Sequence, residues 1–492
     1  MTKIRRLLIA NRGEIACRIQ RTAARLGIET VAVYHAVDAG GPAVRDAAAA
    51  VEITGPSPVA AYLDGAQIIA AAKQAGADAI HPGFGFLSEN AGFAKAVEDA
   101  GLIWVGPTPA AIELMGDKQA ARAFAAEHGV PLAPSAEGGD PAELAARGAE
   151  IARPVLVKAA AGGGGKGMRI VAAGEDLEKA IRAAMSEAER AFGDGRVYVE
   201  RYVEQPRHVE VQVLGDGARV IHLGTRDCSI QRRFQKIVEE APAPALPPAT
   251  RSGLEETAVR LAAACGYRSA GTVEFIVAPD GAFYFLEMNT RLQVEHPVTE
   301  EITGIDLVEQ QIAIAEGAPL SLEQEAVVIG TEGHSVEVRL YAEDAENGFV
   351  PATGRLLRLH LPEASWLRWE SGIEAGGQVT ADFDPMIAKL VVHGPDRSTA
   401  IARMVGVLDD LTLLGVTTNQ FFLRRTLAHP AFGRAEVHTG FIDLHGADLK
   451  APAEPVGELA ALATAAVLAA PPELADQQVP MPYGAMGGWR NV

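Results

Sequence analysis

The chain has 492 residues, and 48% of them are hydrophobic, which is enough for several cores and for about three compact units. Its formal net charge of −19 argues against a general nucleic-acid-binding or anionic-membrane-binding surface. Cys17, Cys228 and Cys265 show no paired spacing, which predicts a reducing compartment and no zinc site.

The amino-terminal segment is basic and then apolar for only four residues before Asn11 and Arg12. It is too short for a signal peptide and is predicted to form a first strand. No stretch of the sequence reaches the roughly 18 apolar residues that a membrane span needs. We therefore expect a soluble, cytoplasmic protein.

Strands and helices alternate over residues 1–115. The predicted order is strand Arg6–Ala10, helix Glu14–Leu26, strand Thr30–His35, helix Ala66–Ala75 and strand Ala77–His81. This order favours a parallel, doubly wound sheet. A dinucleotide-binding fold with Asp38 as the ribose acid is an alternative. The turn Asn11-Arg12-Gly13, however, has one glycine where that fingerprint needs three.

A glycine-rich loop, Gly162–Gly167, separates two predicted strands in a small α/β insert that runs from Gly129 to about Val203. It is not a Walker A loop, because a glycine follows Lys166 where Ser or Thr should be and no helix begins there. We interpret it as a flap whose N–H groups wrap phosphates, with Lys158 on the strand that enters it. A flexible surface hairpin is the alternative.

A cationic segment, Gly224–Lys236, follows the predicted strand Val220–Leu223. In an acidic protein, such a segment is either a solvated loop or an anion site. The segment alone does not decide between the two.

Two apolar, β-rich segments flank Asp280-Gly281, which predicts a hairpin. A turn centred on that pair places Glu274 directly opposite Glu287, with Asn289 on the same face of the strand as Glu287. Opposed carboxylates repel each other, and Mg²⁺ held between them would reverse the sign of the interaction. We therefore predict a divalent cation at these three residues. A solvated pair of acids on an exposed sheet face is the alternative.

The segment Phe285–Pro297 is unusually polar for one that begins as a buried strand, since it contains two acids, two amides, an arginine and a histidine. Globular proteins rarely desolvate so many polar groups together unless a ligand satisfies them. We therefore expect a ligand site here.

Residues 331–447 are predicted to form another α+β unit, which begins with strand Ser335–Tyr341 and carries Glu337 and Arg339 on one face. Residues 448–492 are rich in Ala and Pro, with one helix-like stretch near Glu458–Ala469. A linker, an appended helix and a docking tail remain alternatives for this tail.

An ordered set of motifs closely resembles the biotin carboxylase component of biotin-dependent acyl-CoA carboxylases, an ATP-grasp enzyme. The resemblance covers about residues 3–445. The motifs are Ile9–Ala16, His81–Asn90, Met115–Lys118, the glycine loop, Gln231–Arg233, Glu239–Pro242 and Phe285–Pro297.

The resemblance implies an α/β, ATP-grasp fold. It implies a Rossmann-like N-terminal domain at residues 1–115 and an ATP-grasp domain at 116–330, which includes a mobile glycine-flap lid at about 130–203. It further implies an α+β C-terminal domain at 331–447. The tail at 448–492 resembles the start of a carboxylase linker region. The resemblance also implies a homodimer.

The resemblance further implies roles for the residues that match its motifs. ATP binding is implied for Lys118, Lys158, Gly163, Gly164, Gly165, Lys166, Glu200, Arg201, Val203, His208 and Gln231. Mg²⁺ or Mn²⁺ would be held by Glu274, Glu287 and Asn289. Bicarbonate and biotin would meet Lys236, Arg291, Gln293, Val294 and Arg339, with Glu295 as the catalytic base.

The implied reaction is ATP-dependent carboxylation of carrier-linked biotin by bicarbonate through carboxyphosphate, the first half-reaction of an acyl-CoA carboxylase. Another ATP-grasp ligase would share the flap and the metal acids but would not need Gln293-Val294-Glu295. A non-catalytic carboxylase scaffold is a further alternative, and the intact set of site residues argues against it. Arg291–Glu295 and Arg339–Glu337 could also be ordinary structural ion pairs.

The sequence departs from the family pattern at two positions. Phe234 stands where the family usually has a histidine that is expected to reach a ribose hydroxyl, and phenylalanine cannot make that bond. Arg201 stands where lysine is common beside adenine. The chain contains no Ala-Met-Lys-Met biotinylation sequence, although Pro482–Arg490 resembles the start of the linker that precedes a carrier. A biotin carrier, separate or further along a longer chain, and a carboxyltransferase are therefore the expected partners.

Overall fold

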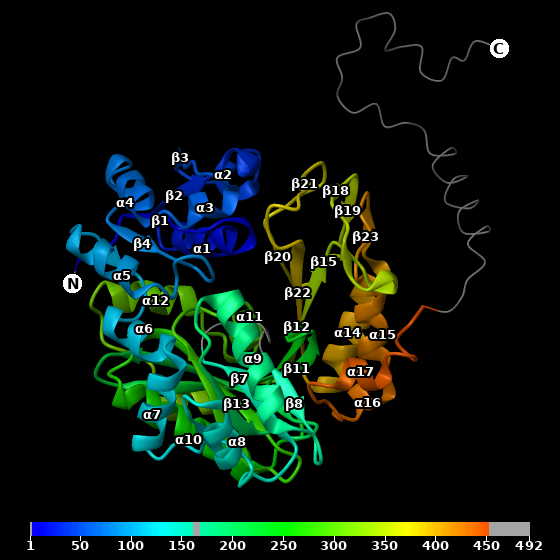
Figure 1. The fold of residues 1–492 in the computed structure, drawn as a ribbon. Coiled ribbons are helices and arrows are strands. Elements are labelled where there is room, and N and C mark those ends of the chain that lie inside the picture. The colour runs from blue at the N-terminus through cyan, green and yellow to red at the C-terminus, as the bar shows by residue number, and fades with distance from the viewer. Residues whose placement is uncertain (1, 161–167, 452–492) are drawn as a thin grey trace, which may run out of the picture. The chain divides into compact units, whose positions relative to one another are not determined.

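The computed structural model describes residues 2–160 and 168–451. The described residues up to Leu449 form one compact unit. Within the described ranges, no helix is both long enough and apolar enough to cross a lipid bilayer. Figure 1 shows the order of the strands and helices in this unit.

A parallel sheet with the strand order β3-β2-β1-β4-β5 forms the N-terminal part of this unit. Its strands are β1 Arg6–Ile9, β2 Glu29–Tyr34, β3 Ala49–Glu52, β4 Ala79–His81 and β5 Ile103–Trp104. The helices are α1 Gly13–Arg25, α2 Pro42–Arg45, α3 Pro58–Tyr62, α4 Gly65–Gln74, α5 Ala91–Asp99 and α6 Pro109–Gly116, with the 3₁₀ turn η1 Ala36–Asp38. The parallel pairing confirms the predicted doubly wound sheet.

Asp38 does not stand free as a ribose acid would in a dinucleotide fold. Both of its oxygens accept hydrogen bonds from Arg12, at 2.7 and 2.6 Å, and Tyr62 donates its hydroxyl to the same carboxylate at 2.7 Å. The Arg12 guanidinium also stacks on the Phe383 ring, 3.7 Å from its centroid. Arg12, held by Asp38, therefore connects the N-terminal sheet to a later part of the chain.

A second, small sheet has the order β6-β9-β7-β8, and its pairs are antiparallel. Its elements are β6 Ser135–Glu137, α8 Pro141–Gly148, β7 Val155–Ala159, β8 Arg169–Val171, α9 Leu177–Phe192 and β9 Val197–Arg201. The predicted strands on either side of the glycine-rich loop are thus β7 and β8. The loop itself, with Gly163, Gly164, Gly165 and Lys166, lies outside the described residues.

The largest sheet has the order β14-β13-β10-β11-β12-β15-β22-β20 and is antiparallel throughout. Its strands are β10 Arg207–Asp216, β11 Val220–Arg232, β12 Gln235–Ala241, β13 Arg268–Val277, β14 Phe283–Asn289, β15 His334–Tyr341, β20 Leu367–Ser371 and β22 Met386–Gly394. The helices in this part of the unit are α7 Lys118–Glu127, α10 Pro248–Ala264, α11 His296–Thr303, α12 Leu307–Ala315 and α13 Gln324–Gly330.

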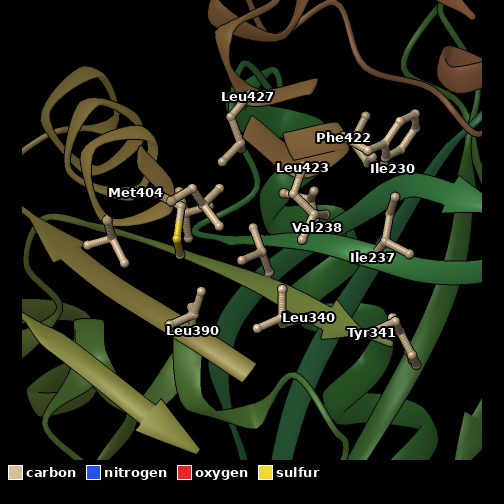
Figure 2. Close-up of a cluster of buried hydrophobic side chains, with 14 of the residues drawn as sticks. Ile230, Ile237, Val238, Leu340, Tyr341, Leu390, Met404, Phe422, Leu423 and Leu427 are labelled. Carbon is tan, nitrogen blue, oxygen red and sulfur yellow. The ribbon is translucent and has the colours of Figure 1, made fainter. Parts of the chain in front are cut away.

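The remaining elements belong to the C-terminal part of the unit. They are β16 Glu343–Asp344, η2 Ala345–Asn347, β17 Val350–Pro351, β18 Gly354–Arg355, β19 Arg358–His360, β21 Gln378–Val379, α14 Arg397–Asp410, β23 Thr412–Leu414, α15 Gln420–Ala428, α16 Pro430–Gly433 and α17 Phe441–His445. A large apolar cluster lies between α14, α15 and the strands β12, β15 and β22 (Figure 2). Buried Met404 and Leu423 pack there against Val238 and Leu390.

One face of the large sheet carries charge across several strands. Glu287, Glu274, Glu210 and Arg226 are successive cross-strand partners on β14, β13, β10 and β11. Further along, Arg339 on β15 lies opposite Lys389 on β22. Buried charges persist in folded proteins only when they are paired or bind a ligand, so this face is a candidate functional site.

Candidate active site

The two carboxylates predicted to oppose each other do so across β13 and β14. Glu274 and Glu287 are direct partners in the strand register. The turn differs from the prediction, because the Ala278 N–H bonds to the Ala282 carbonyl at 2.7 Å and closes a three-residue loop. Near the turn the register is offset by one residue, and a β-bulge at Leu286 restores the predicted pairing.

Asn289 lies beside both acids. Its Nδ2 donates to Glu274 at 3.4 Å and to Glu287 at 3.3 Å, while its Oδ1 accepts from Arg291. Two carboxylates and an amide oxygen suit Mg²⁺, which prefers oxygen ligands. A half-turn of the Asn289 amide would direct its oxygen toward the acids. The residues present therefore fit the predicted divalent cation.

Glu210 on β10 is a third acid in this group and was not predicted from the sequence. It pairs in register with Glu274 on one side and with Arg226 on the other. Burial, together with the nearby Glu295 carboxylate, raises the pKa of Glu210 to about 7. A signal was present, because polar and apolar residues alternate strictly over His208–Val213 and place every polar residue on one face.

Lys236 joins three buried acids, two of this group and Glu295. Its Nζ donates to Glu274 at 3.0 Å, to Glu295 at 2.8 Å and also to Glu210. Burial alone would lower the pKa of a lysine, but the three carboxylates hold the pKa of Lys236 well above its ordinary value. The cationic segment Gly224–Lys236 is therefore not a solvated loop, because most of it lies in strand β11 and its last residue is directed into the site.

Glu295 is a fully buried carboxylate held by two cations. Its Oε1 accepts from Lys236, and its Oε2 accepts from Arg339 at 3.0 Å. Burial disfavours the ionised form, yet Lys236 and Arg339 hold the pKa of Glu295 well below its ordinary range. Glu295 is thus ionised, close to two positive charges and shielded from water.

Neither of the two structural ion pairs considered from the sequence forms. Arg339 donates from Nε to Glu239 at 2.6 Å instead of to Glu337. Within the described part of the chain, neither oxygen of Glu337 has a hydrogen-bond partner. Arg291 pairs with Glu89, at 2.9 Å, rather than with Glu295.

Arg291 is oriented by polar side chains on both sides. It donates from Nη1 to Gln293 Oε1 at 2.9 Å, and Gln293 donates from Nε2 to Glu274 at 3.0 Å. Its partner Glu89 also accepts from the Thr290 N–H at 3.2 Å. Glu89 lies in the motif His81–Asn90, where the sequence analysis gave no single residue a role. A distant motif therefore fixes the direction of the Arg291 guanidinium.

A separate ion-pair group links the small sheet to α7. Glu200 accepts from Lys158 at 3.0 Å and from Arg122 at 2.8 Å, so both of its oxygens are occupied. Burial opposes the charge of Lys158, but Glu200 raises the pKa of Lys158 above its ordinary value. Arg122 was missed by the sequence analysis because it lies within an Ala-rich helix and outside any motif.

His208 connects the acids to Gln231. The distance from His208 Nε2 to Glu274 Oε2 is 2.9 Å, and Gln231 Nε2 lies 2.9 Å from His208 Nδ1. Despite burial, Glu274 raises the pKa of His208 above its ordinary value. Lys118 Nζ lies 4.0 Å from Glu287 Oε2 on the other side of the acid pair.

One cavity of about 1150 Å³ brings these residues together. It is lined by every predicted site residue that the structure describes, namely Lys118, Lys158, Glu200, Arg201, Val203, His208, Gln231, Lys236, Glu274, Glu287, Asn289, Arg291, Gln293, Val294, Glu295 and Arg339. Phe234, where the family usually has histidine, lines it as well. Residues spread over more than 200 positions of sequence thus face one space.

Three family models match the chain. They are "Biotin carboxylase, N-terminal domain" over residues 3–112, "Carbamoyl-phosphate synthase L chain, ATP binding domain" over 117–323, and "Biotin carboxylase C-terminal domain" over 337–444. Together they cover most of the described chain.

Curated relatives fall into two kinds. The alpha subunit of mitochondrial methylcrotonoyl-CoA carboxylase from Dictyostelium discoideum is 47% identical over 99% of this chain and 70% of its own length. The corresponding subunit from Oryza sativa is 50% identical over 91% of this chain and 61% of its own length. Biotin carboxylase from Nostoc is 46% identical over 89% of this chain and 99% of its own length. The chain therefore spans about two thirds of such alpha subunits and nearly all of a separate biotin carboxylase.

Solved structures show the same fold. The biotin carboxylase domain dimer of Hydrogenobacter thermophilus 2-oxoglutarate carboxylase, in complex with MgADP, ADP and bicarbonate, has a TM-score of 0.87 and 42% identity. It covers 92% of this chain and 100% of that one. Biotin carboxylase from Campylobacter jejuni, in a β,γ-ATP complex, has a TM-score of 0.86 and 44% identity over 90% of this chain and 99% of that one.

Proposed function

Because this chain belongs to the biotin carboxylase family, whose ATP-grasp ligases use ATP, Mg²⁺ and biotin, we propose that it carboxylates carrier-linked biotin with bicarbonate. The observation that carries the proposal is a buried, ionised Glu295 held by Lys236 and Arg339, in one cavity with the opposed acids Glu274 and Glu287. An anion-binding group beside a site for metal-bound nucleotide is what coupling of bicarbonate to ATP requires.

The metal-binding residues in this proposal are Glu274, Glu287 and Asn289. When bound, Mg²⁺ would neutralise charge on the nucleotide phosphates. Glu274 already has protein cations on its other side, since Lys236 and His208 hold its pKa below the ordinary value although burial opposes this. The protein therefore offsets part of the repulsion between the acids before any metal binds.

The bicarbonate site is proposed at Arg291, Gln293, the Val294 amide and Lys236. The guanidinium of Arg291 presents a planar fork that matches the shape of a flat oxyanion. Gln293 and Glu89 hold that guanidinium, at 2.9 Å each. Little reorientation is then needed when the anion arrives.

Glu295 is proposed as the base that accepts the bicarbonate proton while a bicarbonate oxygen attacks the γ-phosphorus of ATP and ADP leaves. Its pKa is low because Lys236 and Arg339 contact it. An incoming anion that draws Lys236 toward itself would weaken that contact and raise the basicity of Glu295. Arg339 would then stabilise negative charge on the ureido oxygen of biotin.

The nucleotide would occupy the other end of the cavity, with Lys118, Lys158 and His208 near its phosphates. Adenine is proposed to lie by residues 200–203. Lys158 and Arg122 hold the Glu200 carboxylate, and each of its oxygens keeps a second lone pair that would accept a hydrogen bond from the adenine amino group. The glycine-rich flap, outside the described residues, stays a prediction.

The proposed partners are a biotin carrier and a carboxyltransferase, because the relatives include acyl-CoA carboxylase alpha subunits. A homodimer is proposed because a related biotin carboxylase domain is described as a dimer. A cytoplasmic location also stays a proposal, since the relatives include mitochondrial proteins.

The test is ADP release from ATP in the presence of Mg²⁺, bicarbonate and free biotin. We expect turnover to require bicarbonate and to rise when biotin is added, while Glu295→Gln abolishes the biotin-dependent rate. Arg182→Gln, which removes an exposed ion pair on α9, is the matched surface control and should leave the rate unchanged. If the rate of ADP release does not depend on bicarbonate, the result would instead support assignment of the chain as a different ATP-grasp ligase.

A further inference from the structure

Lys389 on β22 is a fully buried lysine that the proposed mechanism does not use. In the sheet it lies directly between Arg339 on β15 and Glu370 on β20. A buried ammonium group is costly unless its hydrogen bonds are satisfied, so its partners show what it stabilises.

The ammonium group of Lys389 has one close backbone partner and one acidic partner. Its Nζ donates to the Val294 carbonyl oxygen at 2.5 Å and lies 3.3 Å from Glu14 Oε1 on α1. The Val294 carbonyl belongs to the peptide bond that leads into Glu295. Lys389 thus contacts the backbone of the segment whose side chains form the anion site.

Glu295 is consequently held at both ends. Its carboxylate accepts from Lys236 and Arg339, while the peptide on its N-terminal side is fixed through Lys389. We propose that Lys389 is a positioning residue, whose bond to the Val294 carbonyl fixes the peptide that leads into Glu295 and so sets the orientation of Glu295 toward bicarbonate. This inference rests on the proposed function, because it assigns a purpose to one contact of that site.

The preceding peptide is held in a similar way. His296 is fully buried, and its Nδ1 lies 2.7 Å from the Gln293 carbonyl oxygen. Burial, with Lys389 and Arg18 nearby, holds the pKa of His296 well below its ordinary value, so the ring is neutral and donates this bond.

That bond sets the direction of the Val294 amide. In a trans peptide the C=O and the next N–H point in opposite directions, so fixing the Gln293 carbonyl turns the Val294 N–H away from His296. In the ranges that the structure describes, no acceptor contacts this N–H, and Val294 lines the cavity. Two adjacent carbonyls held by buried donors therefore leave an amide available to an anion.

Lys389 also balances buried negative charge. Glu14 and Glu337 are both buried, and neither has a hydrogen-bonded side-chain oxygen among the described residues. Burial raises the pKa of each, and Lys389 opposes that rise. Removing the lysine alone would thus disturb folding as well as the Val294 contact, and a test has to separate the two effects.

The test compares Lys389→Met with the double variant Lys389→Met, Glu14→Gln, which removes the acid together with its cation. Biotin-dependent ADP release gives KM for bicarbonate and for ATP, and thermal unfolding gives the state of the fold. In the folded double variant we expect kcat/KM for bicarbonate to fall by roughly tenfold or more, as for the loss of a hydrogen bond from a charged donor. KM for ATP should change by less than about twofold.

Arg397→Met is the matched control, because it removes a largely buried cation that pairs with Glu240 at 2.6 Å and does not touch the segment. It should lower the melting temperature while the ratio of the two KM values stays constant. An unchanged kcat/KM for bicarbonate in the folded double variant would overturn the inference, and so would a parallel rise of both KM values. Absence of bicarbonate-dependent turnover in the unmodified chain would instead overturn the proposed function, and this inference with it.

Discussion

Phe234 is an apolar residue at the cavity, which other apolar side chains such as Ile276 and Phe349 also line. Its side chain is 59% exposed, and with Arg233 it forms the two-residue turn between β11 and β12. Both residues have positive φ, +48° for Arg233 and +66° for Phe234. Such a conformation costs roughly 1–2 kcal/mol per non-glycine residue. Phenylalanine can offer a nucleotide no hydrogen bond here.

We expect Phe234→His to lower KM for ATP by about two- to tenfold, because one added hydrogen bond contributes about 0.5–1.5 kcal/mol. The measurement is the ATP dependence of ADP release at saturating bicarbonate. Phe234→Leu, which removes the ring but adds no donor, is the control and should not lower KM. An unchanged KM in the histidine variant would show that this position does not reach the sugar.

The residues that carried a motif were predictable one by one, whereas their partners were not. The family resemblance of their segments implied the roles of Lys236, Arg291 and Glu295, and all three line the cavity. Glu89 and Arg122, which hold Arg291 and Glu200, come from elements remote in sequence. Pair formation depends on tertiary packing, and a single sequence carries no direct record of it.

At the scale of elements, the pairing of Glu274 with Glu287 in the β13–β14 hairpin was predicted correctly, but the turn that connects the strands was not. The sequence places an Asp-Gly turn between two apolar strands, and Glu274 does face Glu287. The real loop has three residues and is compensated by a bulge at Leu286. Bulges depend on the twist and packing of the whole sheet, so turn chemistry alone does not reveal them.

The junction between α1 and β20 is a second element-scale feature, formed by charged residues. Glu370 is fully buried and accepts from Arg21 on α1 and from Arg368, the latter at 2.5 Å. Although burial opposes ionisation, Arg368 and Arg21 lower the pKa of Glu370 to about 2. Each unit of such a shift corresponds to 1.36 kcal/mol, so the fall from an ordinary value near 4.5 is worth roughly 3 kcal/mol.

We expect Glu370→Gln to lower the free energy of unfolding by roughly 3 kcal/mol at pH 7. A depressed pKa gives stability that is complete above the unfolded value of about 4.5 and is lost as the pH falls toward 2. Urea unfolding at pH 7, 5, 4 and 3 should therefore show equal differences at pH 7 and 5 and smaller ones below. A difference that persists unchanged at pH 3 would contradict this account.

At the scale of the whole molecule, one continuous sheet includes strands from two regions that the sequence predicts as separate domains. β12 and β15 pair across the domain boundary predicted at residue 330, and α14 and α15 pack on the same strands (Figure 2). The predicted boundaries remain predictions. Local periodicity identified the alternation in residues 1–115, but it contains no information on which distant strands join.

The same scale explains how a chain with a net charge of −19 can bind anions. Lys236, Arg291 and Arg339 converge on one cavity, each held by acidic side chains that keep it in place. Local geometry thus overrides the average charge at the site.

The most direct test is a crystal structure of the chain with Mn²⁺, a non-hydrolysable ATP analogue and bicarbonate. We predict an anomalous peak between Glu274 and Glu287, together with bicarbonate within hydrogen-bond distance of Arg291, the Val294 amide and Glu295. A structure in which the two acids point apart with no metal between them, or in which bicarbonate binds away from Glu295, would contradict the account.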